Sequence, residues 1–237
     1  MCHIIFQDLE KDKYSEEPKI ALVRPVFKKN ERNKIENYRP VSILNGLSKI
    51  YERFIHNSLS SYAENILSDF IAAYRKTYSS NHVLLRLIEN WKKSLDNKNF
   101  VGTVLMDLSK AFECIPHDLL VAKLHAYGLS ENAVTFIYSY LKRRKQSVKI
   151  NNTESIFQIL LSGVPQGSIL GPILFNIFIN DLFLFLKDVD LANFADDNTI
   201  YTANKNIEVL IKILERESKS AIDWFKMNEM IVNPDKF

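Results

Sequence analysis

The chain has 237 residues, of which 46% are hydrophobic and 25% charged, and this balance is typical of a globular protein with a sizeable core. A net charge of +3 is too small to identify a partner. The two isolated cysteines form neither a disulfide framework nor a CxxC motif, as expected in a reducing compartment. Neither a repeat nor a low-complexity linker marks a boundary, so the length allows one large domain or two subdomains.

The first elements in chain order are two β-like runs and a helix. Residues 1–19 are polar and charged after a short apolar start, which indicates a leader or a truncated remnant rather than a signal peptide. The runs at 20–27 and 38–44 predict strands, and Pro40 favours a sheet edge because proline has no N–H to donate. Apolar residues at helical spacing then predict an amphipathic helix over 47–63.

The middle of the chain combines a helix with a buried strand. Ser79 or Ser80 can cap the helix, whose apolar face is predicted to hold Leu84, Leu87, Ile88, Trp91 and Leu95. The continuous apolar run at 101–106 predicts a buried strand with Asp107 at its carboxyl end. A carboxylate is costly to bury without a partner, so Asp107 is a candidate functional residue held at a rigid position.

Two helices and a hairpin follow this strand. Helices are predicted over 118–127, which Gly128 closes as a C-cap, and from Ser130 to Leu141. The basic cluster at 142–145 is typical of a solvated helix end. Alternating residues predict a hairpin over 146–161.

The last third of the chain contains a second predicted hairpin between two helices. Polar residues interrupt the apolar segment 169–186, which makes it a poor membrane span and predicts a buried helix. Two β-prone runs, 189–194 and 199–203, predict a hairpin with Asp196-Asp197 at its tip. A long amphipathic helix is predicted over 207–225.

The adjacent carboxylates at this tip repel each other, and a divalent cation relieves that repulsion. Hard carboxylate oxygens suit Mg²⁺ or Mn²⁺. The alternative is a solvated polar turn, because Asp and Asn are ordinary turn residues. If the strands that carry Asp107 and Asp196-Asp197 are neighbours in one sheet, three carboxylates converge at one edge. Such a cluster can hold two cations about 3.5–4 Å apart for in-line nucleotidyl or phosphoryl transfer.

A family resemblance is carried by blocks that occur in a fixed order at 38–44, 105–112, 163–172 and 194–197. Together they resemble the reverse transcriptase domain of non-LTR (LINE-type) retrotransposons, from about Ile20 to Phe237. The resemblance implies an α+β right-hand polymerase fold with fingers and palm and with the thumb absent.

The same resemblance implies a division into fingers over 20–100 and palm over 101–237, with the 146–160 hairpin contributing to the fingers. The palm would be an antiparallel sheet that carries the aspartates, backed by helices at 118–145 and 205–226.

The resemblance also implies roles for individual residues. Asp107 and Asp196 would be the principal ligands of Mg²⁺ or Mn²⁺, with Asp197 beside them and the backbone carbonyl of Leu108 contributing. Phe112 matches a steric gate that selects dNTP over rNTP, although core packing alone would also explain this ring. Gln166 and Gly167 would lie along the incoming nucleotide and the template, because glycine lets the backbone approach a ligand closely. The remaining implied roles are triphosphate contacts by Arg39, Lys49 and Arg75, and general acid catalysis by Lys236.

Departures from the family pattern occur at Glu113, where the family usually has Asp, and over 73–80, the segment that contains Arg75. The chain ends at Phe237 without a predicted thumb, and no endonuclease precedes the fingers. Both features bear on the activity expected of this chain.

The leading functional hypothesis is an RNA-directed DNA polymerase domain that uses an RNA template, a DNA primer and dNTPs, without a membrane partner. An RNA-dependent RNA polymerase is less favoured because of Phe112 and because Ala195 precedes the paired aspartates. A catalytically inactive or domesticated fragment that binds nucleic acid is the non-enzyme alternative. Location in the nucleus or in a cytoplasmic ribonucleoprotein follows from the resemblance alone.

Overall fold

The computed structural model describes residues 7–233, and contacts group the chain into two compact units. Unit 1 comprises Met1–Ala63 and Ile115–Leu174, and unit 2 comprises Glu64–Cys114 and Phe175–Phe237. The expected boundary at residue 100 does not coincide with this grouping, and the assignment of fingers and palm stays a prediction.

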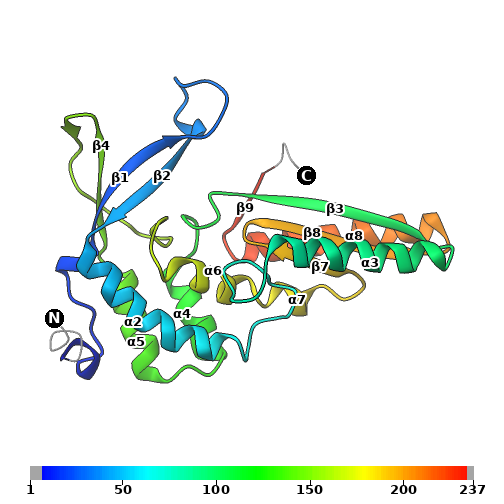
Figure 1. The fold of residues 1–237 in the computed structure, drawn as a ribbon, viewed down its shortest axis with the longest axis horizontal. Helices are drawn as coiled ribbons and strands as arrows, with labels where there is room; N and C mark the ends of the chain where they lie inside the picture. The colour runs from blue at the N-terminus through cyan, green and yellow to red at the C-terminus, as the bar shows by residue number, and fades with distance from the viewer. Residues whose placement is uncertain (1–6, 234–237) are drawn as a thin grey trace. The chain divides into compact units, whose positions relative to one another are not determined.

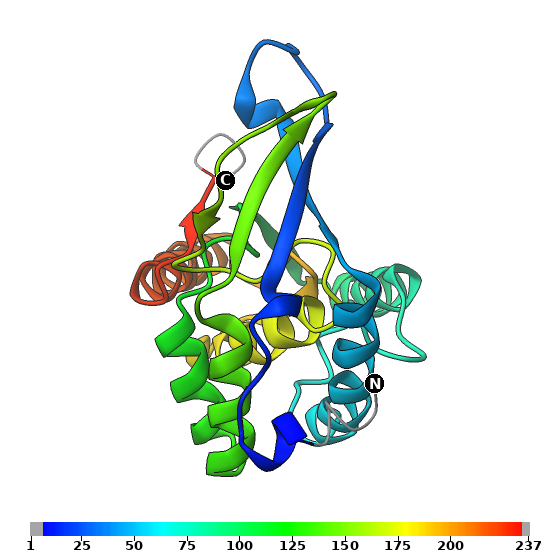
Figure 2. The same cartoon turned by 90° about the vertical axis from the view of Figure 1, so that its left-hand side faces the viewer.

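The sheet of unit 1 is built from β1 (Ile20–Phe27), β2 (Tyr38–Leu44), β4 (Lys145–Ile150), β5 (Thr153–Glu154) and β6 (Gln158–Ile159). Its order is β2-β1-β4-β5, and β6 also pairs with β4. β1 runs antiparallel to β2 and parallel to β4. Figure 2 shows β4 beside β1. β2 is therefore at the edge, as Pro40 predicts, and β4 forms the predicted hairpin with short partners.

The helical part of unit 1 consists of η1 (Glu17–Lys19), η2 (Ile35–Asn37), α2 (Gly46–Ala63), α4 (His117–Ala126) and α5 (Glu131–Leu141). Both caps predicted in this unit are confirmed: the Ser130 side chain accepts a hydrogen bond from the Ala133 N–H, and Gly128 follows α4 with φ of +89°. The Tyr14 ring packs edge-on against Tyr51 and Tyr140, with ring centroids 4.8 and 5.1 Å away. This aromatic cluster is part of the core of the unit.

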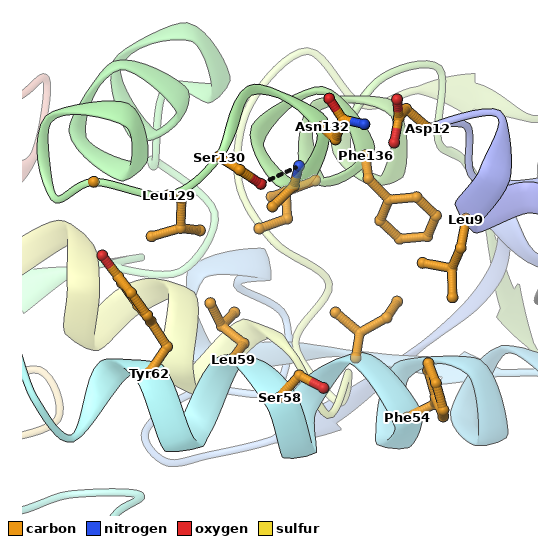
Figure 3. Close-up of a pocket in the computed structure, with 14 residues that line it drawn as sticks. Leu9, Asp12, Phe54, Ser58, Leu59, Tyr62, Leu129, Ser130, Asn132 and Phe136 are labelled. Carbon is orange, nitrogen blue, oxygen red and sulfur yellow. Dashed lines mark hydrogen bonds between the residues drawn. The ribbon is translucent and has the colours of Figure 1, made fainter.

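A cavity of about 510 Å³ opens between α2 and α5 (Figure 3). Phe54, Leu59 and Tyr62 on α2 face Leu129 and Phe136 across it. Among the described residues that line this cavity, none is a predicted site residue.

Unit 2 is organised around a sheet made of β3 (Phe100–Ser109), β7 (Asp190–Phe194), β8 (Asp197–Asn204) and β9 (Ile231–Val232). The order is β7-β8-β3-β9, and every pairing is antiparallel, as predicted. α8 (Ile207–Met227) packs on β8 and β3, and α3 (Ser80–Asp96) lies along the sheet (Figure 1). Gly102 permits this close approach, because a Cβ there would lie 2.5 Å from the Leu214 side chain of α8. The helices within 118–145 were also expected to back this sheet, but their contacts group them with unit 1.

Two expectations about burial in unit 2 are wrong. β3 is not buried throughout, because its side chains alternate and Leu105 is 65% exposed. α3 buries only a narrow stripe, in which Leu87 packs with Ala192 and Tyr201, whereas Leu84 is 54% exposed. An apolar run or a helical stripe in the sequence does not reveal how much of that strand or helix its neighbours will cover.

The segment 169–186 is not one helix but two, α6 (Gly171–Ile179) and α7 (Leu182–Phe185). The break contains Asn180, whose side chain accepts a hydrogen bond from the Ser68 N–H and donates one to the Ile66 carbonyl. None of the described helices is long and apolar enough to span a membrane.

Candidate active site

Asp107 and Asp197 are directly opposite each other in the antiparallel pairing of β3 with β8. Directly opposed side chains of neighbouring strands point to the same face of a sheet. Asp107 is half-buried and Asp197 is exposed. The strands predicted to be neighbours are therefore neighbours, and their register places two carboxylates side by side.

Asp196 belongs to the two-residue turn between β7 and β8, in which Ala195 has φ of +58°. Asp197 is the first residue of β8 rather than part of the tip, so the predicted position of the turn is wrong by one residue. A tight two-residue turn is the connection that fits the twist of paired strands. The turn therefore holds Asp196 half-buried beside the Asp107–Asp197 pair.

Two buried asparagine amides hold the backbone of this turn by hydrogen bonds. Asn193 and Asn198 face each other across the β7–β8 pair, and both are almost fully buried. Asn193 Nδ2 donates to the Ala195 carbonyl at 2.7 Å and to Asn198 Oδ1 at 3.0 Å. Asn198 Nδ2 donates to the Asp196 carbonyl at 3.1 Å. These bonds satisfy the carbonyls of both turn residues and fix the backbone that presents Asp196.

A second strand contacts the other side of Asp107. The backbone N–H of Asn233, just beyond β9, donates to the Asp107 carbonyl at 3.0 Å. The Asn233 side chain donates to Asp107 Oδ2 at 3.1 Å. Leu108 is buried and pairs with Val232 on β9. Asp107 is therefore oriented from β9 as well as from β8.

Phe112 lies in an aromatic stack within unit 2. Its ring stacks on Phe175 with centroids 4.8 Å apart, and Tyr74 approaches edge-on at 6.2 Å. Phe112 itself is half-buried and Tyr74 is 52% exposed. The ring is therefore held in a defined orientation by its neighbours while part of its surface stays accessible, as a role in sugar selection would require.

The charge of Asp196 reaches two ionisable neighbours. Burial raises the pKa of Tyr74, and Asp196 raises it further. Burial also raises the pKa of Glu113, where Lys110 acts in the opposite direction and Asp196 adds to the rise. Both effects place Tyr74 and Glu113 in the electrostatic surroundings of the turn aspartate. Clusters of perturbed acidic groups are a mark of functional sites.

The donor chemistry of this edge fits a hard divalent cation. Asp107, Asp196 and Asp197 offer carboxylate oxygens from two paired strands and their turn. Within residues 7–233, however, no group of three or more His, Cys, Asp or Glu side chains has the arrangement to hold a metal ion. The residue types and their shared edge therefore match Mg²⁺ or Mn²⁺, whereas the side chains do not form a closed coordination cluster.

Gln166 and Gly167 occupy a turn in unit 1 that docks on β2. The Gln166 carbonyl accepts a hydrogen bond from the Ser42 N–H at 2.8 Å. Gly167 has φ of +120°, and a Cβ there would lie 2.6 Å from the Ser42 carbonyl oxygen. Only glycine fits this close backbone approach. Gln166 Oε1 is buried and has no hydrogen-bond partner in the described part of the chain.

The predicted phosphate-binding cations differ in their surroundings. Arg39 on β2 and Lys49 on α2 are exposed. The Arg75 side chain is only 4% exposed and forms an ion pair with Glu64, with Nη2 and Oε2 2.7 Å apart. Arg75 Nη1 also donates to the Ser68 and Ile71 carbonyls. These contacts give Arg75 a structural role, and the expected triphosphate contact stays a prediction. Lys236 lies outside the described residues.

Sequence reasoning missed the amide side chains that support the site. Asn193 and Asn198 flank the paired aspartates, and Asn233 stands shortly before Lys236 in the sequence. Asparagine is disfavoured inside strands, so two asparagines in β-prone runs beside the acidic pair were the available signal. Tyr74 gave no signal, because its approach to Phe112 depends on a turn whose backbone has φ of +62°.

Comparison with known proteins places this geometry in a family. Residues 26–237 match the family model described as reverse transcriptase (RNA-dependent DNA polymerase). The chain is 31% identical over 216 residues to the probable RNA-directed DNA polymerase from transposon BS of Drosophila melanogaster. This match covers 85% of this chain and 23% of the relative. It is 26% identical to the polymerase from mobile element jockey of the same species, with the same two coverages. The chain thus spans about a quarter of the length of these relatives.

Solved structures with a similar fold include telomerase. Apo telomerase from Candida tropicalis, truncated from its C-terminal domain, superposes with a TM-score of 0.66 at 15% identity. The match covers 94% of this chain and 50% of the telomerase chain. At this identity the likeness concerns the right-hand polymerase fold. The family match, the relatives and the paired aspartates at one sheet edge agree. The chain belongs to the reverse transcriptase family and is a domain of the kind found in LINE-like retroelements.

Proposed function

We propose that this chain catalyses RNA-directed DNA synthesis, in which a primer 3′-hydroxyl attacks the α-phosphate of an incoming dNTP and pyrophosphate leaves. The observation that carries the proposal is the register of β3 and β8, which sets Asp107 opposite Asp197 beside the turn that holds Asp196. Carboxylates gathered at one sheet edge are what metal-assisted nucleotidyl transfer requires.

Asp107 and Asp196 would hold Mg²⁺ or Mn²⁺, with Asp197 and the Leu108 carbonyl beside them. When bound, the cations would lower the pKa of the attacking hydroxyl and neutralise charge on the reacting phosphate. The buried amides of Asn193 and Asn198 hold the turn, and Asn233 orients the Asp107 carboxylate. These contacts support a preorganised edge, so that little rearrangement accompanies substrate binding.

Other residues of this chain would bind and select the substrates. The Phe112 ring, held by Phe175 and Tyr74, would exclude a 2′-hydroxyl and so favour dNTPs over rNTPs. Gln166 is half-buried in its turn, and it would lie along the incoming nucleotide and the template. Arg39 and Lys49 are exposed cations available to phosphates.

A second candidate function is nucleic-acid binding without catalysis. It is favoured by one observation, the lack of a closed three-residue metal cluster within residues 7–233. Under this alternative the exposed cations would still bind the phosphate backbone, whereas the aspartates would have no catalytic role.

Primer extension on an RNA template tests the proposal. The 237-residue chain is supplied with Mg²⁺ or Mn²⁺ and with dNTPs or rNTPs, and wild type is compared with Asp196→Asn. The matched control is Asp190→Asn, which alters an exposed carboxylate at the other end of β7. We expect extension with dNTPs that Asp196→Asn lowers on the order of a thousandfold and that Asp190→Asn retains.

The contrary outcomes separate the alternatives. Template binding without extension by wild type under any condition would support the binding fragment. Efficient incorporation of rNTPs would indicate an RNA-dependent RNA polymerase. Equal extension by wild type and Asp196→Asn would overturn the assigned role of the paired aspartates.

A further inference from the structure

Unit 1 contains a buried carboxylate that the proposed chemistry does not use. Glu52 lies on α2 and is 0% exposed. Its Oε1 accepts a hydrogen bond from the Tyr140 hydroxyl at 2.9 Å, and its Oε2 accepts one from the Ile169 backbone N–H at 2.6 Å. Ile169 follows the Gln166-Gly167 turn by two residues, so a helix near the start of the chain is tied directly to this loop.

Glu52 is surrounded by buried polar and charged side chains, whose removal from water costs free energy. Tyr14, Ser48, Tyr140 and Arg144 are also fully buried. The Arg144 guanidinium lies 4.8 Å from the centroid of the Tyr140 ring, and its Nη1 donates to the Tyr140 carbonyl at 3.2 Å. Arg144 Nε and Nη2 have no hydrogen-bond partner within residues 7–233. Arg144 was expected to be a solvated residue of the 142–145 cluster, and that expectation is wrong.

Stability alone is a poor explanation of this arrangement. Burial raises the pKa of Glu52, and the Ile169 N–H, the Tyr140 hydroxyl and the Arg144 charge only act against that rise. Buried ionic groups are often replaced by apolar residues of similar volume without loss of stability. An apolar residue at position 52, however, could not accept a hydrogen bond from the loop backbone.

The loop that Glu52 contacts is held at successive points. At its start, the Gly163 N–H donates to the Ile115 carbonyl, and His117 Nε2 lies 2.7 Å from the Gly163 carbonyl oxygen. Ser42 on β2 then donates its N–H to the Gln166 carbonyl. The Glu52–Ile169 bond is the anchor on the far side of Gly167. The Gln166-Gly167 turn is therefore bracketed by one backbone anchor and one buried carboxylate.

We propose that Glu52 is a positioning residue for nucleotide binding, which fixes the Gln166-Gly167 turn through its hydrogen bond to the Ile169 backbone. This inference rests on the proposed polymerase function. Loss of the anchor frees the turn, so the nucleotide binds a less ordered site. The effect falls on the KM for dNTP more than on kcat, because the aspartates of unit 2 are untouched.

Two variants of the full chain separate positioning from stability. Glu52→Met combined with Arg144→Met removes both buried charges together with the acceptor. No uncompensated charge is left, although the Tyr140 hydroxyl and the Ile169 N–H lose their acceptor, so the variant is expected to fold, with reduced stability and without the anchor. Glu52→Gln keeps an oxygen that can accept from the Ile169 N–H, but it leaves the Arg144 charge uncompensated. It is therefore expected to lower stability and to preserve the KM for dNTP.

The measurements are urea unfolding, primer-extension kinetics and hydrogen exchange of the Ile169 amide. For the double variant we expect the KM for dNTP to rise about tenfold, as loss of one charge-assisted hydrogen bond implies. Its kcat should change less, and its Ile169 amide should exchange at least about tenfold faster than wild type. Glu52→Gln should also have a lower unfolding midpoint, but with an unchanged KM.

The possible failures are distinguishable. A double variant with wild-type Ile169 exchange, or with faster exchange and an unchanged KM, would overturn the positioning role and leave the polymerase function standing. A KM that follows unfolding stability in both variants would also overturn it. A wild-type chain without RNA-templated extension would overturn the polymerase function and this inference with it, whatever the exchange rates.

Discussion

Asn233 holds Asp107 by two hydrogen bonds, one from its backbone N–H to the Asp107 carbonyl at 3.0 Å and one from its side chain to Asp107 Oδ2 at 3.1 Å. A carboxylate with a proposed catalytic role is therefore oriented by a neutral amide. Replacing the amide of Asn233 by a carboxylate adds a negative charge beside Asp107 and hardly changes the size of the side chain.

Asn233→Asp is expected to lower extension at neutral pH and to move the acidic limb of its pH profile upward. A second carboxylate about 3 Å away raises the pKa of the pair, so the ionised form is reached only at higher pH. The measurement is the extension rate as a function of pH. Asn204→Asp, at the far end of β8, is the control and should keep the wild-type profile. An unshifted limb in Asn233→Asp would show that Asn233 does not govern Asp107.

Ala195→Val is expected to destabilise the turn by about 1–2 kcal/mol, because the residue has φ of +58° and a β-branched side chain is strained there. Ala195→Gly should be neutral or slightly stabilising, since glycine adopts positive φ freely. Urea unfolding measures both changes. Equal stability of the two variants would contradict the assigned turn conformation.

Gly167→Ala should destabilise unit 1 or displace its turn, since the new Cβ would lie 2.6 Å from the Ser42 carbonyl oxygen at a φ of +120°. We expect a loss of about 1–3 kcal/mol in unfolding free energy, together with weaker dNTP binding. Gly46→Ala is the matched control, because a Cβ at Gly46 meets nothing within 4 Å. A similar result for both glycines would argue against the close approach.

Arg75→Ala and Arg39→Ala should fail in different ways. The Arg75 side chain is buried, whereas its partner Glu64 is 45% exposed, so the loss of this screened ion pair and of the bonds to two backbone carbonyls should cost about 1–3 kcal/mol of stability. Arg39 is exposed on β2, and its loss should raise the KM for dNTP while leaving unfolding unchanged. Urea unfolding and extension kinetics on both variants decide this. A KM effect of Arg75→Ala in a fully folded protein would support the triphosphate role expected from the resemblance.

His117 predicts a pH dependence of stability. Burial is the main influence and lowers the pKa of His117 below 6.5, although its hydrogen bond to Gly163 acts in the opposite direction. The unfolded chain therefore binds the proton more readily, so this contribution to stability is complete above pH 6.5 and is lost as the pH falls. His117→Gln should flatten the slope of unfolding free energy against pH in this acidic range. An unchanged slope would exclude His117 as its source.

Much of the fold follows from local pattern. α2 and α8 have apolar residues at helical spacing, and β3 and β8 are β-prone runs. Ser130 and Gly128 are residue types that favour the cap positions they occupy. These features depend on neighbours within a few residues, and such features are the most predictable. The shared edge of Asp107 and Asp197 followed once those strands were assumed to be adjacent.

The remaining features depend on distant partners. Arg144 resembles a solvated residue of a basic cluster, and its burial arises from Tyr140 and from Glu52, which lies 88 residues from Tyr140. The Arg75 side chain is withdrawn from solvent by Glu64, a partner that no motif marks. Tertiary contacts of this kind have no local signature, so the charge pattern misassigned Arg144 and gave no sign that the Arg75 side chain is buried.

The two-residue connection between Phe194 and Asp197 has a genetic consequence. Side chains of a strand alternate between faces, so one inserted or deleted codon that shifted the β8 pairing by one position would turn Asp197 to the opposite face from Asp107. Such a copy would keep its hydrophobic content and most of its helices yet lose the charged edge. Among relatives of this chain, an in-frame length change in this short connection is therefore expected to disturb the acidic edge more than a conservative substitution in the surrounding strands.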